Sequence, residues 1–458
     1  MTITNNHTLV FAPLASVFIY FVLLNLGLEY TPAVTAAITF LTVTLWVTEA
    51  LPIPATSLIP FALFPMFDVI DYKEAASGLG SHVILLLMGA FMLSKSLEKS
   101  GAHERLAGYM VNFVGAHSAQ RLVFGFMLAS GFLSMWISNT ATVLIMLPMA
   151  LAIMSHVDNQ RLKVALLLGI AYSASLAGTG TLIGTPPNVI FAAIYQETTG
   201  TEYSFTQWMK TGIPIVVISL PLIALWLTRG VTLENEIKLP QLGKWRTEEK
   251  RTLIIFGITA LAWIFRTEPF GGWQNLFYIE LAGDSTVALL ACVVAFATPN
   301  GKGGRILDWD TAKEIPWGML LLFAGGITIA KAFMSSGIST MLGNWLSSFG
   351  DLPIFAIILI ICLSVTYLTE ITSNTATSTL LMPILAVAAT SSGYAPEVFM
   401  IPAAIAASCA FMLPVATAPN AIAYSTGEFE IKDMMREGAI LSFGIAFIVA
   451  GVSYFTLV

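Results

Sequence analysis

The feature that most restricts the folds open to this chain is a succession of long apolar segments joined by short polar connections. About 20 consecutive apolar residues are enough to span the hydrocarbon core of a bilayer. Only 10% of the residues are charged, against about 25% in an ordinary globular domain. So little charge cannot cover so apolar a core in water, and we therefore predict an all-α polytopic membrane protein. The apolar segments lie at roughly residues 9–28, 32–50, 52–67, 81–98, 122–155, 163–195, 211–229, 252–266, 284–298, 315–337, 353–388, 398–426 and 438–457.

Two of these segments, 122–155 and 353–388, are too long for a single crossing and carry a polar motif near their middle. This pattern predicts a re-entrant hairpin in each, a pair of helices that enters and leaves the membrane on the same side. Irregular backbone at a hairpin tip is tolerated only where protein or a water-filled cavity surrounds it. With the two hairpins counted as returns, the remaining segments predict eleven transmembrane helices.

The distribution of Lys and Arg predicts the orientation of the chain. If the N-terminus is cytoplasmic, 17 of the 21 basic residues fall on inner segments, and the outer segments hold Lys73, Lys210, Arg266 and Lys331. Because cytoplasmic loops are enriched in basic residues, we predict a multi-pass protein of the inner (plasma) membrane with an external C-terminus. The first apolar segment is longer than a signal-peptide core and is expected to remain as a helix.

The sequence also contains an internal repeat. The pentapeptide Ser-Asn-Thr-Ala-Thr stands at residues 138–142 and again at 373–377, and Thr-Pro-Pro-Asn at 185–188 is echoed by Thr-Ala-Pro-Asn at 417–420. A third match, upstream of the pentapeptides, pairs Lys95 with Lys331, and all three keep an offset of 232 to 236 residues in the same order. Chance matches would not keep a common offset.

Five predicted crossings in each half invert the second half relative to the first. Inverted five-helix repeats are typical of secondary transporters, whose substrate site lies near the midplane where the halves meet. The predicted organisation is an N-terminal transmembrane helix (1–31), a first inverted repeat with an inner hairpin (32–229), a cytoplasmic linker (230–251) and a second inverted repeat with an outer hairpin (252–458).

The paired Ser-Asn-Thr motifs are the strongest candidates for a binding site. Their hydroxyl and amide groups offer oxygen atoms to a cation, and O–H or N–H donors to an anion. The alternative is that these side chains only cap broken helices. Two copies at matching places in the two halves favour the binding role.

The second pair of motifs predicts helices that are broken inside the membrane. Glycines and prolines interrupt residues 178–188, and Pro414 and Pro419 interrupt the corresponding part of the second half. Proline removes a backbone donor and clashes with the preceding turn, so a regular helix cannot continue. Carbonyl groups freed by the break suit hard cations such as Na⁺, and a helix N-terminus attracts anions. The alternative is an ordinary proline kink satisfied by its neighbours.

None of the four motifs contains Lys or Arg. An anionic substrate would then be held by neutral donors, helix ends and co-bound cations, which is a physical reason for coupling its transport to a cation. The same groups also suit a neutral polar solute.

A few isolated residues allow more than one interpretation. Glu370 precedes the second pentapeptide, where Met135 aligns in the first half. It is a proton-coupling carboxylate, a partner of a basic residue, or a side chain that reaches the outer surface, and we favour a structural role. Glu49 is similarly ambiguous, whereas Lys95 and Lys331 are expected to extend to the membrane interface. The three cysteines lie far apart in apolar stretches and are expected to be buried and unpaired.

Residues 369–377 and 408–422 carry a resemblance to a known family. The run Thr-Glu-Ile-Thr before the second Ser-Asn-Thr, and the run Ser-Cys-Ala-Phe-Met-Leu-Pro-Val-Ala that leads to Asn-Ala-Ile, resemble the divalent-anion/sodium symporter family. The resemblance covers essentially the whole chain. It implies sodium-coupled uptake of C4 dicarboxylates such as succinate, malate and fumarate by an elevator-type mechanism. It further implies a homodimer in the lipid bilayer, with Na⁺ as coupling ion and no cofactor.

The resemblance also implies which residues form the sites. The first sodium site would consist of Ser134, Ser138, Asn139 and the backbone at Gly184, and the second of Thr369, Thr372, Asn374 and the backbone at Ala416. The substrate carboxylates would meet Asn139, Thr140, Thr185, Ser373, Asn374, Thr375 and Thr417. Both asparagines would then touch cation and substrate at once. Ala418 stands where the first half has Pro186, and a Pro-Pro pair is common in relatives, which leaves the substrate preference open.

Other functions remain as alternatives. An intramembrane enzyme would need a Ser–His pair or a His-x-x-x-His helix, and the five histidines at 7, 82, 103, 117 and 156 show neither spacing. A channel would conduct without accumulating solute. Sulfate transport, citrate or tricarboxylate transport, and sodium-independent dicarboxylate exchange would use the same scaffold. No basic run with interleaved aromatics points to nucleic acid.

Overall fold

The computed structural model describes residues 4–154, 159–233, 243–341 and 352–458, and every regular element within them is a helix. The first half contains α1 (Thr4–Asn25), α2 (Tyr30–Thr48), α3 (Ile53–Thr56), α4 (Ile59–Met66), α5 (Tyr72–Ser77), α6 (His82–Ser100), α7 (Ala102–Val114), α8 (Ala119–Ser134), α9 (Asn139–Met154), α10 (Gln160–Ala177), η1 (Gly178–Gly180), α11 (Pro186–Thr199) and α12 (Phe205–Leu227). The second half contains α13 (Thr247–Ile264), α14 (Gly272–Phe277), α15 (Asp284–Ala297), α16 (Trp309–Ala312), α17 (Trp317–Ser335), α19 (Ile354–Thr369), α20 (Asn374–Ser391), α21 (Glu397–Ala406), η2 (Pro414–Ala416), α22 (Ala418–Ser425) and α23 (Ile431–Leu457).

Helix length and composition confirm the prediction of an all-helical, multi-pass membrane protein. Seven helical stretches within the described residues are long and apolar enough to cross a membrane. They are His7–Asn25, Tyr30–Thr48, Tyr72–Ser100, Gln160–Gly180, Phe205–Leu227, Trp317–Ser335 and Ile431–Leu457. Shorter apolar helices, among them Asn139–Met154 and Ile354–Thr369, lie in the segments predicted to form hairpins. The count of eleven crossings and the re-entrant path of the hairpins remain predictions.

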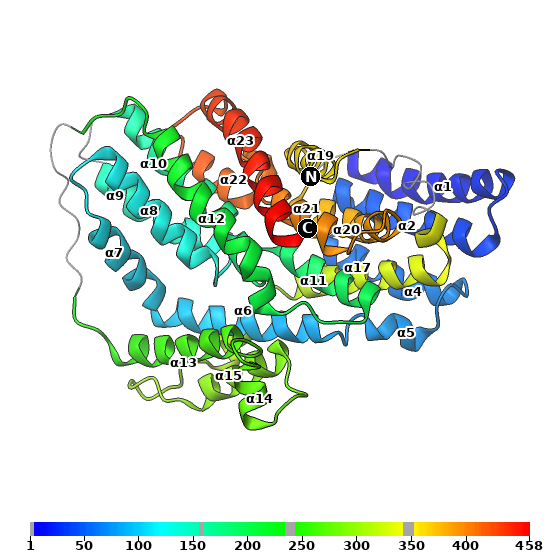
Figure 1. Cartoon of the computed structure of the whole chain (residues 1–458), viewed down its shortest axis with the longest axis horizontal. Helices are drawn as coiled ribbons and strands as arrows, with labels where there is room; N and C mark the ends of the chain where they lie inside the picture. Colours follow the sequence, from blue (N-terminus) through cyan, green and yellow to red (C-terminus); the bar gives the residue numbers. More distant parts are fainter. Residues whose placement is uncertain (1–3, 155–158, 234–242, 342–351) are drawn as a thin grey trace.

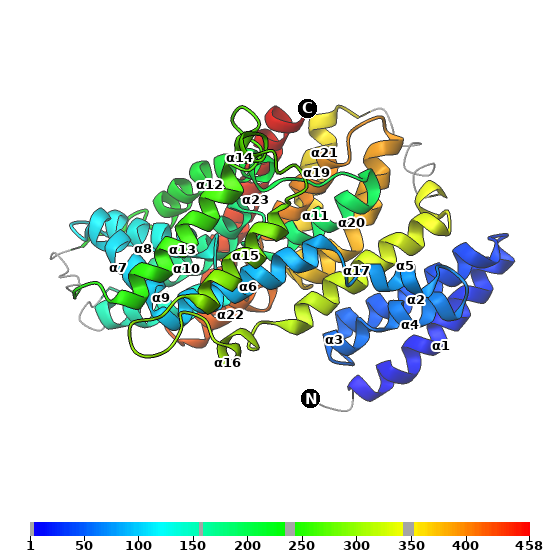
Figure 2. The same ribbon diagram turned by 90° about the horizontal axis from the view of Figure 1, so that it is seen from below.

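Figure 1 shows α11, α12, α17 and α19 to α23 in the middle of the molecule, with other helices at its ends and along one edge. Helices α1 and α2 pack together at one end, and α7 to α9 lie at the opposite end. Helices α13 and α15 pack along α6 at one edge. The start of α1 and the end of α23 lie on opposite faces of the molecule (Figure 2).

Helix α10 forms the centre of the first half, with 89% of its apolar span buried. It packs against α8, α9 and α22. Small residues allow this close contact, because a side chain at Gly131 would lie 2.9 Å from Cβ of Ala177. Ser130 Oγ on α8 donates to the Ile170 carbonyl of α10 at 2.9 Å, so polar groups of the two helices satisfy each other.

The second half repeats this contact between α19 and α21. Thr366 Oγ1 donates to the Ala406 carbonyl at 3.4 Å, across the same separation of 40 residues as the Ser130–Ile170 bond. Cys362, fully buried on the same helix, faces the Pro402 carbonyl. All three cysteines are buried and free, as expected.

Both predicted helix breaks are confirmed. Helix α10 ends at Ala177, one short turn of 3₁₀-helix follows, and α11 starts at Pro186. Helix α21 ends at Ala406, and α22 starts at Ala418. A proline at the first or second position starts each new helix, because these positions need no backbone donor.

The predicted linker, 230–251, falls partly outside the described residues, which omit 234–242. Its C-terminal part is anchored, since Glu249 at the start of α13 is 1% exposed and its Oε2 lies 2.8 Å from Nε of Arg105 on α7. The segment 52–67, predicted as one apolar stretch, is divided into α3 and α4.

Candidate functional site

The two pentapeptides and the two helix breaks meet at one cavity of about 630 Å³. Ten of the residues expected at the sites line it, namely Ser138, Asn139, Thr140, Gly184, Thr185, Ser373, Asn374, Thr375, Ala416 and Thr417. Residues more than 230 positions apart in the sequence are thus brought together. The volume is within the usual range of small-molecule sites, about 300–1,000 Å³.

Four helices begin at this cavity. Helices α9 and α20 start at Asn139 and Asn374 within the two pentapeptides, and α11 and α22 start at Pro186 and Ala418 after the two breaks. A helix N-terminus carries unpaired N–H groups and a partial positive charge, which favour anions. The cavity can therefore attract an anion without a basic residue in the motifs.

Some hydroxyl groups of the motifs also cap helices. Ser138 Oγ accepts from the Ala141 N–H at 3.1 Å, and Thr417 Oγ1 accepts from the Asn420 N–H at 3.2 Å. Each of these hydroxyls keeps its own O–H as a donor. Capping and binding are therefore compatible at these two residues.

Oxygen atoms converge around the Asn139 amide. Ser134 Oγ lies 2.5 Å from Asn139 Oδ1 and 2.5 Å from the Ala174 carbonyl oxygen. When the amide nitrogen points into this group instead, it reaches Ala174 O at 3.3 Å and Gly184 O at 3.1 Å. When the amide oxygen points inward, it joins the Ser134 hydroxyl and the Ala174 and Gly184 carbonyls in a group of oxygens that a cation could bind.

Two glycines permit this arrangement. A Cβ on Gly178 would lie 2.9 Å from Asn139 Oδ1, and a Cβ on Gly184 would collide with the Gly178 carbonyl oxygen. The two sides of the first break can therefore approach only because both positions lack side chains. Ala410 and Ala416 stand at the matching positions of the second half, so the second break is held in a different way.

The second half has a similar but looser group of oxygens. Thr369 Oγ1 donates to Asn374 Oδ1 at 2.8 Å and lies 3.3 Å from the Ala407 carbonyl. Three of the expected ligands, Ser134, Thr369 and Thr372, do not line the cavity, and Thr372 makes bonds of another kind. Its hydroxyl bonds the Leu368 carbonyl at 2.9 Å and Thr377 Oγ1 at 2.6 Å.

A buried asparagine binds backbone carbonyl groups at each break. Asn188 Nδ2 donates to the carbonyls of Gly178 at 3.1 Å and Thr181 at 2.7 Å. Asn420 Nδ2 donates to the matching carbonyls, those of Ala410 at 3.0 Å and Leu413 at 3.1 Å. Sequence inspection found these asparagines as part of the repeat but assigned them no role.

Three charged residues at the cavity were missed as site residues: Lys95, Glu98 and Glu314. Lys95 Nζ bonds Glu98 Oε2 at 2.8 Å, so its ammonium group is paired at the cavity, and its extension to the membrane interface remains a prediction. The i, i+3 spacing of the two on one predicted helix was the available signal. The Lys331 ammonium group binds Glu197 at 3.1 Å and Ser77 at 2.8 Å.

The described residues hold no group of three or more His, Cys, Asp or Glu side chains that could bind a metal. A cation at the cavity would thus be bound by neutral hydroxyl, amide and carbonyl oxygens. Such a set suits Na⁺ better than transition metals, which prefer imidazole and thiolate.

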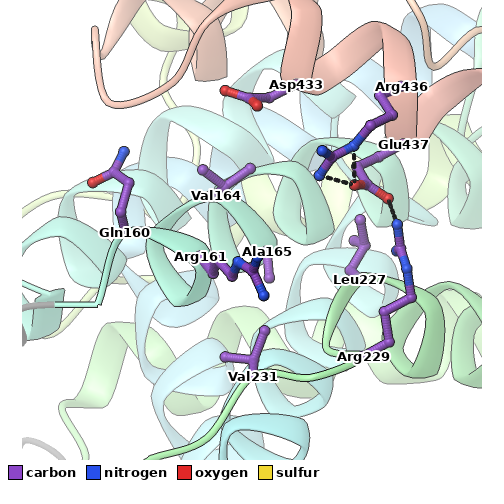
Figure 3. A pocket seen from close by; sticks show the side chains of 10 residues that line it. All are labelled: Gln160, Arg161, Val164, Ala165, Leu227, Arg229, Val231, Asp433, Arg436 and Glu437. Atoms are coloured by element: carbon purple, nitrogen blue, oxygen red, sulfur yellow. Dashed lines mark hydrogen bonds and ion pairs between the residues drawn. The ribbon is translucent and has the colours of Figure 1, made fainter.

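A second cavity of about 550 Å³ lies between α10, α12 and α23, away from the motifs (Figure 3). Two of its guanidinium groups already bind one buried carboxylate, since Arg229 lies 2.7 Å and Arg436 2.8 Å from oxygens of Glu437. The cavity contains none of the expected site residues.

Substituting Gly184 by alanine should destabilise the first break. The added methyl would overlap the Gly178 carbonyl, and such overpacking costs about 1–3 kcal/mol. Gly257→Ala on α13 is the matched control, because a Cβ there meets open space and should be neutral or stabilising by about 0.4–1 kcal/mol. Thermal unfolding in detergent measures both, and equal stability of the two variants would contradict the close approach.

Comparison with known proteins now places the chain among transporters. Residues 43–398 match the family model described as citrate transporter. The sodium-dependent dicarboxylate transporter SdcS of Staphylococcus saprophyticus is 40% identical over 88% of this chain and 82% of its own length. The protein of that name from Staphylococcus aureus is 38% identical over 92% of this chain and 85% of its own.

Two solved structures share the fold at low sequence identity. The Alcanivorax borkumensis YdaH transporter aligns with a TM-score of 0.58 at 14% identity, covering 84% of this chain and 88% of its own. Neisseria gonorrhoeae MtrF, described as one of a class of antimetabolite efflux pumps, aligns with a TM-score of 0.56 at 13% identity, covering 83% and 82%.

Proposed function

The chain belongs to the divalent-anion/sodium symporter family, and from this premise we propose that it couples the entry of Na⁺ to the uptake of a C4 dicarboxylate such as succinate, malate or fumarate. It is a transporter and not an enzyme. The observation that carries the proposal is the single cavity at which both pentapeptides and four helix N-termini meet. The names of the staphylococcal relatives supply the substrate class and the coupling ion.

Each half contributes one sodium site in this proposal. The first is formed by Ser134, Ser138, Asn139 and the Gly184 carbonyl, which the oxygens around the Asn139 amide support. The second is formed by Thr369, Thr372, Asn374 and the Ala416 carbonyl. Thr372 has the weakest support, because its hydroxyl is already bonded away from the cavity.

The dicarboxylate lies between the two sodium sites. One carboxylate meets Asn139, Thr140 and Thr185, and the other meets Ser373, Asn374, Thr375 and Thr417. The charge of the dianion is balanced by helix N-termini and the two cations, because the motifs contain no basic residue. Substrate binding then requires sodium, which is the basis of coupling.

Alternating access proceeds by an elevator-type movement in this proposal. Helices α8 to α11 and α19 to α22 pack on one another around the cavity and are able to move as a unit. Helices α6, α13 and α15 form a separate packed group, suited to a fixed scaffold. The charged residues at the cavity, Lys95, Glu98 and Glu314, lie on segments predicted to be cytoplasmic, which supports access to the cavity from that side.

The proposal retains the predicted membrane arrangement of eleven crossings, two re-entrant hairpins and inverted repeats at 32–229 and 252–458. The matched bonds of Ser130 and Thr366, and those of Asn188 and Asn420, support the repeat. The opposite locations of the two chain ends agree with a cytoplasmic N-terminus and an external C-terminus in the inner membrane. The proposal of a homodimer rests on membership of the family alone.

Citrate or another tricarboxylate is the second candidate substrate. The matching family model is described as citrate transporter, and this description is what favours a tricarboxylate. Sulfate transport and sodium-independent exchange have no comparable support.

Purified protein in liposomes should accumulate radiolabelled succinate under an inward Na⁺ gradient and not under an equal gradient of K⁺ or choline. Without Na⁺ the dianion lacks its counter-charge. Equal uptake in all three salts would contradict sodium coupling. Competition by C4, C5 and C6 acids and by sulfate in the same liposomes would identify the preferred anion.

A further inference from the structure

The buried carboxylate of Glu370 has an unusual set of partners. Glu370 follows α19, four residues before Asn374, and is 4% exposed. Its partners among the described residues are hydrogen-bond donors: the N–H groups of Phe411 and Leu413, and that of Met412 between them. Two of the alternatives raised from the sequence, a basic partner and a place at the outer surface, are therefore wrong.

The three N–H groups belong to the second helix break, where the chain has left helical geometry. Phe411 N donates to Oε1 at 2.8 Å, Met412 N to both oxygens at 3.0 and 3.1 Å, and Leu413 N to Oε2 at 3.1 Å. Buried N–H groups without partners are costly. A carboxylate is acceptor-only and can receive all of these bonds at once, whereas a neutral amide cannot.

Other side chains bind the remaining groups of this segment. The Phe411 carbonyl accepts from Tyr172 Oη at 2.7 Å, and Asn420 binds the carbonyls of Ala410 and Leu413. Ser442 Oγ on α23 lies 3.4 Å from Glu370 Oε1. Side chains therefore bind much of this segment's backbone, beside backbone bonds such as that from the Ala416 N–H to the Leu413 carbonyl at 3.2 Å, and Glu370 is the charged member of that set.

The first half holds its break differently. Its chain continues after α10 as a 3₁₀ turn, and the hydroxyl of Thr181 donates to the backbone carbonyl of Met135. Met135 and Thr181 occupy the positions that Glu370 and Leu413 occupy in the second half. Both halves thus join the residue three positions before the pentapeptide to the break, but only the second does so with a charge.

We propose that Glu370 is a positioning residue that joins the second hairpin to the second break, and so places Asn374 and Ala416 at the distance required for the second cation. This inference rests on the proposed sodium-coupled function and deepens it. Asn374 follows Glu370 on the hairpin, and Ala416 follows the three bonded N–H groups by only a few residues, so the carboxylate sets the distance between them.

Glu370→Gln tests the proposal, because the Gln amide nitrogen would face backbone N–H groups in place of an acceptor. We expect the Na⁺ concentration for half-maximal succinate uptake to rise at least about tenfold, which corresponds to a loss of about 1.4 kcal/mol. The succinate KM at saturating Na⁺ should change less. Glu370→Asp keeps the charge on a shorter side chain and should recover part of the Na⁺ affinity. Glu49→Gln, at an exposed carboxylate, is the matched control.

A second readout does not depend on transport. NaCl, compared with choline chloride, should raise the thermal stability of purified wild-type protein and of Glu49→Gln, and raise it less in Glu370→Gln. An unchanged Na⁺ requirement in Glu370→Gln, or a lower maximal rate alone, would overturn the positioning role. If Glu370→Gln does not fold, Glu370→Asp decides by the same measurements. Failure of the wild-type protein to show sodium-dependent uptake would instead reject the proposed function.

Discussion

Replacing either Asn139 or Asn374 with alanine should abolish sodium-driven succinate uptake while the protein remains folded. In the proposed site each asparagine is both a cation ligand and a substrate donor, so one substitution removes two interactions. Hydrogen bonds and ligand contacts to charged groups contribute about 1.5–3 kcal/mol each. A combined loss of about 3 kcal/mol corresponds to a reduction of about 100-fold or more.

The two variants test the sites of the two halves separately. Asn139→Ala removes the amide from a tight group of oxygens that includes Ser134 at 2.5 Å, whereas Asn374→Ala removes it from a looser one with Thr369 at 2.8 Å. Asn112→Ala, at an exposed asparagine of α7 that bonds the Gly108 carbonyl of its own helix, is the control. Uptake at wild-type rates in either test variant would show that the site is misplaced.

Replacing Asp284 with alanine should cause the largest loss of stability among the charged residues considered. Asp284 is fully buried, and its Oδ1 lies 2.7 Å from Nε of Arg266, which is itself 5% exposed. Its other oxygen accepts from the Phe205 N–H at the start of α12, at 3.0 Å. Removing one member of a buried pair leaves an uncompensated charge and costs about 3–5 kcal/mol.

The chain offers an exposed ion pair as a control for this measurement. Lys210 and Glu268 lie 2.7 Å apart, but their side chains are 57% and 48% exposed. Exposed pairs contribute about 0–1 kcal/mol, so Glu268→Gln should unfold close to the wild-type temperature. Denaturation of both variants in the same detergent tests the prediction, and similar midpoints would show that the buried pair does not connect α12 with α13 and α15.

Several properties of the protein could be predicted without a structure because they depend on local chemistry. The apolar segments indicated a membrane protein, and helices of suitable length are present. Glycine and proline indicated two broken helices, and the breaks occur at the expected residues. The common offset of the motifs paired Asn188 with Asn420, and the structure shows that the two make matching bonds.

The structure added contacts that were not predicted from the sequence. Lys95 forms an ion pair with Glu98 on the next turn of α6, and both residues line the cavity. Thr372 matches the family motif, and its hydroxyl bonds the Leu368 carbonyl and Thr377 Oγ1. Hydropathy describes one segment at a time, so it does not show which groups line a shared cavity.

The sequence by itself determined that this chain is a helical membrane protein with duplicated polar motifs, because hydropathy and proline chemistry act within single segments. Only the tertiary structure decided that Asn139 and Asn374 face one cavity, and that Glu370 binds the N–H groups of a segment 41 residues away. The shared cavity and the Glu370 contacts both depend on how the helices of the two halves pack. Packing reflects the shape and hydrogen-bonding needs of many neighbours at once, which no local pattern contains.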